Sequence, residues 1–178
     1  MHNDTRRRTL RVHYTASVAW RTSLLCILML GGATTACSQN VQTQNQTMDQ
    51  LPAAARLLQT QSATVGEPEQ RIVRDPAAWA ALWASLHAGM PAPPLPPVDF
   101  EREVVAFATM GTRSTGGFEL NVTGTRRVGQ DLEVVLVETI PAADCMLTQA
   151  ETAPTVVVRV PSAPGAMRFT VQRKTQRC

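Results

Sequence analysis

This chain lacks a long apolar run, a metal-binding cysteine motif and, beyond its first 37 residues, an excess of positive charge. The apolar run over residues 24–30 is far shorter than the roughly 20 residues that a membrane-spanning helix needs. Of 17 basic and 14 acidic residues, five basic residues and one acidic residue precede Cys37, which leaves 12 basic against 13 acidic. That balance argues against a nucleic-acid partner. Beyond Cys37 the chain has no CxxC pair and a single histidine, His87, so neither a metal nor a cofactor site is expected.

The first 36 residues are typical of a secretory signal peptide. Basic residues precede the apolar run, and small residues follow it up to Cys37. Residues 34–37, Thr-Thr-Ala-Cys, resemble a bacterial lipobox, so we expect Cys37 to be acylated, with palmitate among its chains, and to anchor the protein in a membrane. An ordinary signal peptide with an incidental cysteine is the alternative. Residues 5–11 also resemble a twin-arginine export signal, but the general secretory route is preferred because Arg21 separates them from the apolar run.

The residues after Cys37 predict where the protein resides and where its folded part begins. By resemblance to Gram-negative lipoproteins, Ser38 directs the protein to the outer membrane, so the expected location is the periplasmic face of that membrane. Residues 37–62 are polar and nearly uncharged, and we predict a flexible tether with only a weak tendency to a short helix over 51–58. The folded domain is predicted over 63–178.

Two of the four cysteines remain available for a disulfide. Cys26 leaves with the signal peptide, and Cys37 is assigned to lipid. Disulfides persist outside the cytoplasm, so Cys145 and Cys178 are predicted to form one bridge. A catalytic thiol is disfavoured because no base can be identified for it.

One helix is expected just after residue 74. Asp75 suits the N-cap and Pro76 the first helical position, while Gly89 suits the end. The side chains that share one face at helical spacing are apolar and should pack into the core: Trp79, Leu82, Trp83 and Leu86. The proline-rich residues 91–97 are interpreted as a stiff crossing to the sheet rather than as a polyproline ligand.

Strand patterns dominate the rest of the domain. Residues 104–110 are almost wholly apolar, as in a strand that is buried on both faces, and alternating patterns follow over 118–123, 132–140, 156–160 and 167–171. Short strands with brief turns predict an α+β fold, an antiparallel meander of about five strands with the helix packed on the sheet. In a meander the loops 111–117 and 141–154 lie at one end, and Cys178 arrives there close to Cys145.

The stretch from Val104 to Val160 resembles the C-terminal domain of PrcB-type protease-complex subunits. The resemblance rests on a Gly-x-Arg-x-Thr-Gly-Gly-aromatic loop, a hairpin and a Pro…Cys…Thr…Pro loop, in which the matching residues are Gly111, Arg113, Thr115, Gly116, Gly117, Cys145, Thr148 and Pro154. Phe118 stands where tyrosine is common, and Thr155 stands where an aromatic residue often follows the proline. The family's named member is a lipoprotein that assembles with a surface protease. The resemblance therefore implies an accessory, protein-binding role.

Three classes of function are compatible with these residues. The preferred class is a non-catalytic envelope lipoprotein that binds a protein partner through residues of the two loops: Gly111, Arg113, Thr115, Gly116, Gly117, Phe118, Asp144 and Thr148. In the second class, loop 115–118 enters a protease cleft, as the similar loop of chagasin-type inhibitors does. An enzyme is the least favoured class, because neither Ser114 nor Cys145 has a positioned base, and no catalytic residue is assigned. For Arg113, a salt bridge to Asp144 or Glu119, or hydrogen bonds within the loop, are expected before a ligand contact.

Overall fold

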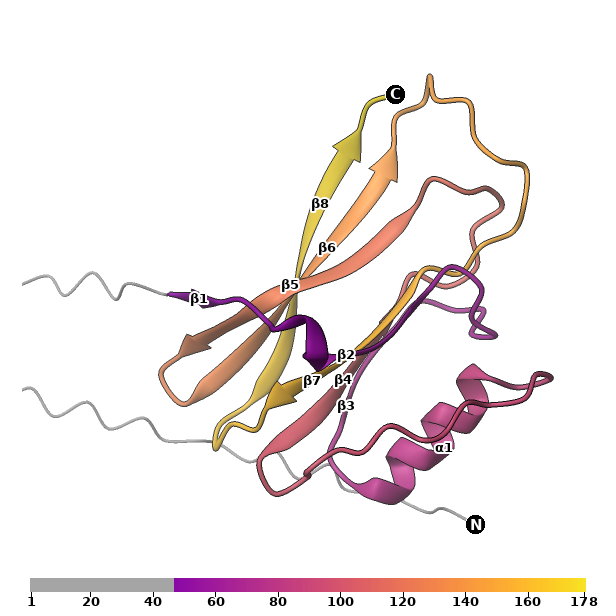
Figure 1. The fold of residues 1–178 in the computed structure, drawn as a ribbon. Coiled ribbons are helices and arrows are strands. Elements are labelled where there is room, and N and C mark those ends of the chain that lie inside the picture. The colour runs from indigo at the N-terminus through magenta and orange to yellow at the C-terminus, as the bar shows by residue number, and fades with distance from the viewer. Residues whose placement is uncertain (1–46) are drawn as a thin grey trace, which may run out of the picture. The chain divides into compact units, whose positions relative to one another are not determined.

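The structure, a computed structural model, describes residues 47–178, and the predicted signal peptide and lipid-bearing Cys37 lie outside this range. Its elements, in chain order, are β1 (Met48–Asp49), the 3-10 turn η1 (Ala53–Ala55), β2 (Arg56–Thr60), β3 (Glu69–Val73), α1 (Pro76–Leu86), β4 (Glu103–Thr109), β5 (Glu119–Val128), β6 (Asp131–Pro141), β7 (Thr155–Pro161) and β8 (Met167–Gln176). Figure 1 shows α1 lying along β3 and β4, while β5, β6 and β8 form a separate layer. Within residues 47–178, no helix is long and apolar enough to cross a membrane.

The strands form two four-stranded sheets, so the predicted single meander is wrong, although the α+β class is confirmed. One sheet has the order β1-β5-β6-β8 and the other β2-β7-β4-β3. The chain crosses between sheets after β1, β4, β6 and β7, and β8 pairs in parallel with β6 instead of antiparallel with β7. The physical reason lies in the apolar strands: β4 and β7 need cover on both faces, which one sheet and one helix cannot supply.

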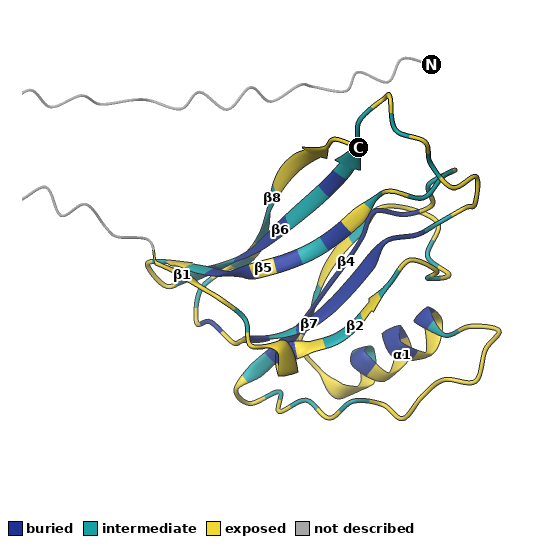
Figure 2. Cartoon of the chain, turned by 45° about the horizontal axis from the view of Figure 1, so that its top comes forward, coloured by how far each residue is buried: buried dark blue, intermediate teal, exposed yellow. Residues whose placement is uncertain are grey.

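Two apolar layers result from this arrangement. Between the sheets, the inner residues of β4 and β7 meet those of β5 and β6, with Val104 and Val156 among the buried side chains. On the other face of β4 and β7, Phe107 and Val157 pack against α1. Figure 2 shows β4 and β7 buried along most of their length, which confirms the prediction of a strand covered on both faces.

The helix follows its sequence signals. The Asp75 carboxylate accepts a 2.8 Å hydrogen bond from the Ala78 amide, and the four apolar residues of the predicted face are buried. The indole nitrogens of Trp79 and Trp83 donate to the carbonyls of Pro96 and Pro93, both at 3.0 Å. These bonds fasten the proline-rich segment along the helix, in keeping with its interpretation as a crossing.

The ordered domain begins earlier than the predicted residue 63. β1 pairs with β5, and β2 pairs with β7, so two strands lie inside the segment predicted as a tether. The leucines explain the difference: Leu57 and Leu58 pack against the helix side of the second sheet, while Leu51 packs against the inter-sheet core. A mostly polar segment joins the fold because these few side chains find apolar cover.

A carboxylate on the outer face of the first sheet predicts how stability changes with pH. Glu133 Oε2 accepts hydrogen bonds from Arg126 at 3.0 Å and from the Thr170 hydroxyl at 3.2 Å. The Arg126 hydrogen bond is the main reason that the pKa of Glu133 lies below its ordinary value of 4.5. The contribution of this carboxylate to folding is therefore complete above pH 4.5 and is lost as the pH falls through the lowered pKa. Denaturant unfolding between pH 5 and pH 2 should show a shallower loss of stability for Glu133→Gln than for the parent chain, and equal slopes would contradict this account.

Candidate functional site

The β4–β5 and β6–β7 loops lie side by side at one end of the domain, as predicted. Arg113 and Thr152 exchange two backbone hydrogen bonds, at 2.7 and 2.9 Å, and the Gly116 amide donates to the Thr148 carbonyl at 2.9 Å. The Thr152 hydroxyl also donates to the Thr115 carbonyl at 2.9 Å. A meander and a two-sheet arrangement share the same alternation of strand direction. The loops therefore meet at one end even though both of them cross between the sheets.

Two glycines of the first loop adopt the left-handed backbone conformation that favours glycine. Gly111 has φ +68° and Gly117 has φ +87°. A Cβ atom on Gly111 would lie 2.7 Å from backbone atoms of the segment 66–68, and the neighbouring Thr112 amide donates to the Gly66 carbonyl at 2.8 Å. The glycine loop is thus held between the second loop and the segment that precedes β3.

A disulfide fastens the second loop to the end of β8. Cys145 and Cys178 are bonded, with their Cα atoms 5.5 Å apart, and the Ala142 amide donates to the Gln176 carbonyl at 2.9 Å. The predicted residues Asp144 and Thr148 are exposed on either side of this attachment. Between them lies Met146, whose exposed fraction is 99%. Met146 was not among the residues predicted for the site. The available signal was an apolar residue directly after a cysteine in a polar loop.

Arg113 does not make the predicted salt bridge. Within residues 47–178 its side chain forms no ion pair with Asp144 or Glu119, and its buried Nε has no hydrogen-bond partner. Its Cζ atom lies 5.5 Å from the centroid of the Phe118 ring, which is half-buried against the inter-sheet core. The backbone of Arg113 holds the loop, so the guanidinium remains available for another role.

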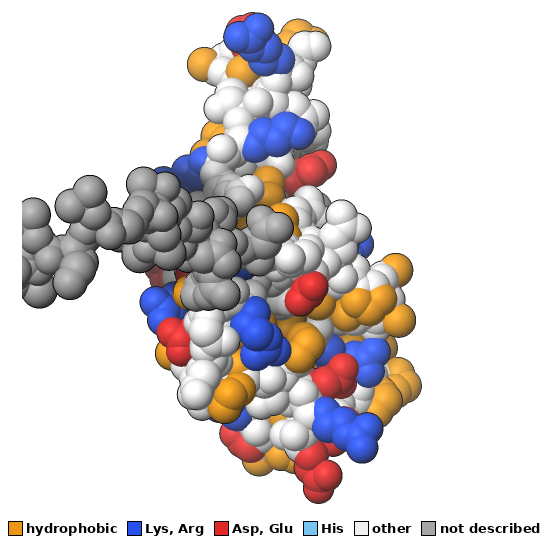
Figure 3. All heavy atoms as spheres, turned by 90° about the vertical axis from the view of Figure 1, so that its left-hand side faces the viewer, with side chains coloured by type: hydrophobic (Ala, Val, Ile, Leu, Met, Phe, Trp, Pro, Cys, Tyr) orange, Lys and Arg blue, Asp and Glu red, His pale blue; other side chains and the backbone are white. Residues whose placement is uncertain are grey.

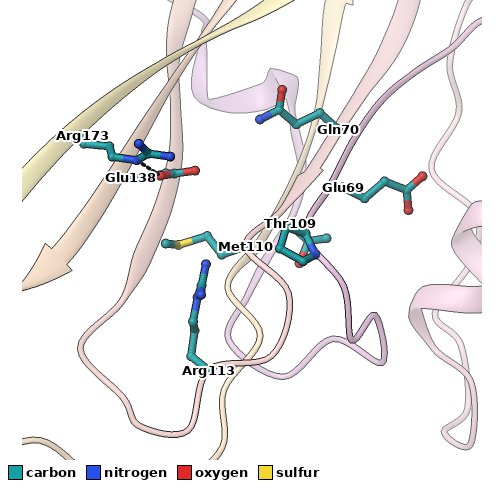
Figure 4. A pocket seen from close by; sticks show the side chains of 8 residues that line it. Glu69, Gln70, Thr109, Met110, Arg113, Glu138 and Arg173 are labelled. Atoms are coloured by element: carbon teal, nitrogen blue, oxygen red, sulfur yellow. Dashed lines mark hydrogen bonds and ion pairs between the residues drawn. The ribbon is translucent and has the colours of Figure 1, made fainter.

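The guanidinium of Arg113 points into a cleft of about 310 Å³ between the two sheets. Gln70 and Met110 line the cleft from the helix-covered sheet, and Glu138 and Arg173 line it from the other. Figure 4 shows Arg113 directed toward Met110 and the Glu138–Arg173 pair, whose ion-pair distance is 3.0 Å. This cleft was not predicted from the sequence. The available signal was a break in the alternation of β6, whose inward positions are apolar up to Leu136 and then charged at Glu138.

The cleft supplies binding groups of both charges. In the described part of the chain, no group of three or more His, Cys, Asp or Glu residues is placed to hold a metal ion. His87 lies at the end of α1, where its Nδ1 is 2.8 Å from the Trp83 carbonyl. This end of the domain therefore has three features: the Arg113 guanidinium in the cleft, the adjacent Glu138–Arg173 ion pair, and the exposed Met146 side chain on the disulfide-bonded loop.

The fold and the site define a two-sheet α+β domain whose two crossing loops lie together at one end. Residues 104–161, from β4 to β7 with both loops, match the family model described as PrcB C-terminal, which confirms the resemblance for this segment. No curated protein and no solved structure matches the chain.

Proposed function

We propose that this chain is a non-catalytic accessory lipoprotein of the bacterial cell envelope that binds a protein partner, a protease-complex component, through its two-loop end. The observation that carries the proposal is Met146, a large apolar side chain that is 99% exposed on a loop fastened by a disulfide and by the glycine loop. A loop held in place loses little conformational entropy on binding. An exposed apolar anchor in such a loop is well suited to fill a pocket on another protein.

The family match supports the accessory role. It covers both loops, and the resemblance implies assembly with a protease. The proposed envelope location rests on the leader and on Cys37, which would join the domain to the outer membrane through acyl chains.

The contacts of the glycine loop weigh against the inhibitor alternative. Insertion into a protease cleft needs a protruding loop, whereas Thr115 and Gly116 are bonded to the second loop and Phe118 packs against the core. The protruding residue at this end is Met146, which lies outside the inhibitor-like motif. We therefore propose partner binding alone.

Recovery of the partner from detergent-solubilised membranes tests the proposal. The full-length tagged chain should recover one specific envelope protein, and Met146→Asp should lower that recovery about tenfold because a charge replaces the apolar anchor. Met90→Asp is the matched control, since Met90 is 56% exposed near the end of α1. Equal recovery with Met146→Asp, or no specific partner at all, would contradict the proposal.

The same cells test the lipid anchor. Cys37→Ser should move the chain from the membrane fraction to the soluble periplasmic fraction, because the acyl chains are the only proposed attachment. A Cys37→Ser chain that still sediments with membranes would refute the anchor without affecting the partner-binding test.

A further inference from the structure

The cleft that holds Arg113 opens between two unpaired strand edges. β3 is the terminal strand of one sheet and β8 the terminal strand of the other, and residues of both line the cleft. β8 is ten residues long, and its backbone pairs only with β6 among the described strands. The side of the domain opposite β1 and β2 therefore presents a cleft flanked by backbone groups that are free to bond to another chain.

The uncompensated charge in this cleft is positive. Of the four charged residues that line it, Glu138 is paired with Arg173 and Glu69 with Arg71, while Arg113 has no carboxylate within ion-pair distance in residues 47–178. The buried Nε of Arg113 lacks an acceptor, and a buried donor without an acceptor is costly. An oxygen anion that enters the cleft would supply that acceptor and form a charge-assisted hydrogen bond.

The residues of β8 beside the cleft also favour a negatively charged ligand. Residues 167–178 contain four basic residues and no acidic one. Arg168 is paired with Asp131, whereas Lys174 and Arg177 form no ion pair within the described residues. Figure 3 shows several basic side chains, with fewer acidic ones beside them, at the top of the view, where Figure 1 places the ends of β6 and β8. A segment that lies along this edge is favoured electrostatically if it is acidic.

From these observations we infer that the cleft binds the carboxylate of an aspartate or glutamate side chain on an extended segment of the partner protein. The inference deepens the proposed function and rests on it. The segment lies beside the β8 edge and bonds to its free backbone groups, and its acidic side chain enters between Arg113 and Arg173. The cleft volume of about 310 Å³ suits one or two side chains, because it is at the lower end of the roughly 300–1,000 Å³ of small-ligand pockets.

Titration of the full-length chain with capped peptides tests this inference. The probes are a five-residue peptide with one glutamate among valines and threonines, the same peptide with glutamine, and glutarate. The glutamate peptide should bind about tenfold more tightly than the glutamine peptide, as expected for a charge-assisted hydrogen bond. Its binding should also shift the Nε–H NMR signal of Arg113. Glutarate, which lacks the backbone groups, should bind much more weakly.

Two substitutions in the cleft have opposite expected effects. Arg113→Gln should abolish the preference for glutamate, whereas Glu138→Gln should strengthen binding of the glutamate peptide several-fold because it removes the competing carboxylate and frees Arg173. Arg102→Gln is the control, since Arg102 is 85% exposed at the opposite end of β4. Tighter peptide binding by Glu138→Gln cannot result from a loss of folding. This variant therefore still tests the inference if Arg113→Gln does not fold stably.

Several results would overturn the inference. These are equal binding of the two peptides, glutarate binding as tight as that of the glutamate peptide, or an unchanged preference in Arg113→Gln. If the peptides fail while Met146→Asp still abolishes partner recovery, the cleft assignment falls and the proposed function stands. If no partner is recovered at all, the proposed function falls, and with it the claim that the acidic segment belongs to a partner.

Discussion

Removal of the Cys145–Cys178 disulfide should lower the free energy of unfolding by about 3–4 kcal/mol. The two cysteines are 33 residues apart in sequence, and in the chain-entropy model a cross-link over a loop of this length restricts the unfolded chain by that amount. The folded state also changes, because the bridge attaches the Met146 loop to the end of β8. Without the bridge, amide hydrogen exchange in residues 142–150 should accelerate more than in β4 or β7.

The measurement is denaturant unfolding of the Cys145→Ser, Cys178→Ser double variant beside the parent chain. Chemical reduction of the parent chain should cause the same loss of stability. The same reducing treatment should not change the stability of the double variant, which is therefore the matched control. A loss below about 1 kcal/mol would show that the bridge adds little to the fold.

Gly111→Ala should lower the free energy of unfolding by about 3 kcal/mol and push the first loop away from residues 66–68. The residue has φ +68°, where an L side chain is strained by about 1–2 kcal/mol. The new Cβ would also lie 2.7 Å from backbone atoms of residues 66–68, which cannot move away as a flexible side chain could. Overpacking of this kind adds about 1–3 kcal/mol.

Gly129→Ala separates the conformational cost from the steric cost. Gly129 has φ +62° in the β5–β6 turn, and a Cβ there would meet nothing within 4 Å. We therefore expect a loss of only about 1–2 kcal/mol and unchanged recovery of the partner. Similar losses at both glycines would mean that the close approach of residues 66–68 does not constrain the loop.

These two predictions concern the same feature, which is how firmly the two-loop end, the proposed binding surface, is held before the proposed partner binds. The disulfide fastens the second loop from the β8 side, and Gly111 lets the first loop close against residues 66–68. If either attachment is lost, the partner must order the loops as it binds, and affinity should fall even though Met146 is still present.

Local signals in the sequence determined α1, the strands β4 to β8 and the end of the domain where the loops meet. The Asp75 cap and the tryptophan spacing define α1, and the apolar run of β4 requires cover on both faces. The alternation of strand direction placed the loops together and brought Cys178 to Cys145, because that alternation does not depend on which strands pair.

Strand partners and the cleft were decided only by the tertiary structure. β8 pairs with β6 rather than with its chain neighbour β7, and β1 and β2 join the sheets from a segment that looks like a tether. These pairings depend on long-range burial of apolar faces, which local patterns do not encode. The cleft has the same origin: Arg113, Glu138 and Arg173 are far apart in sequence, and only the packing of one sheet on the other brings them together.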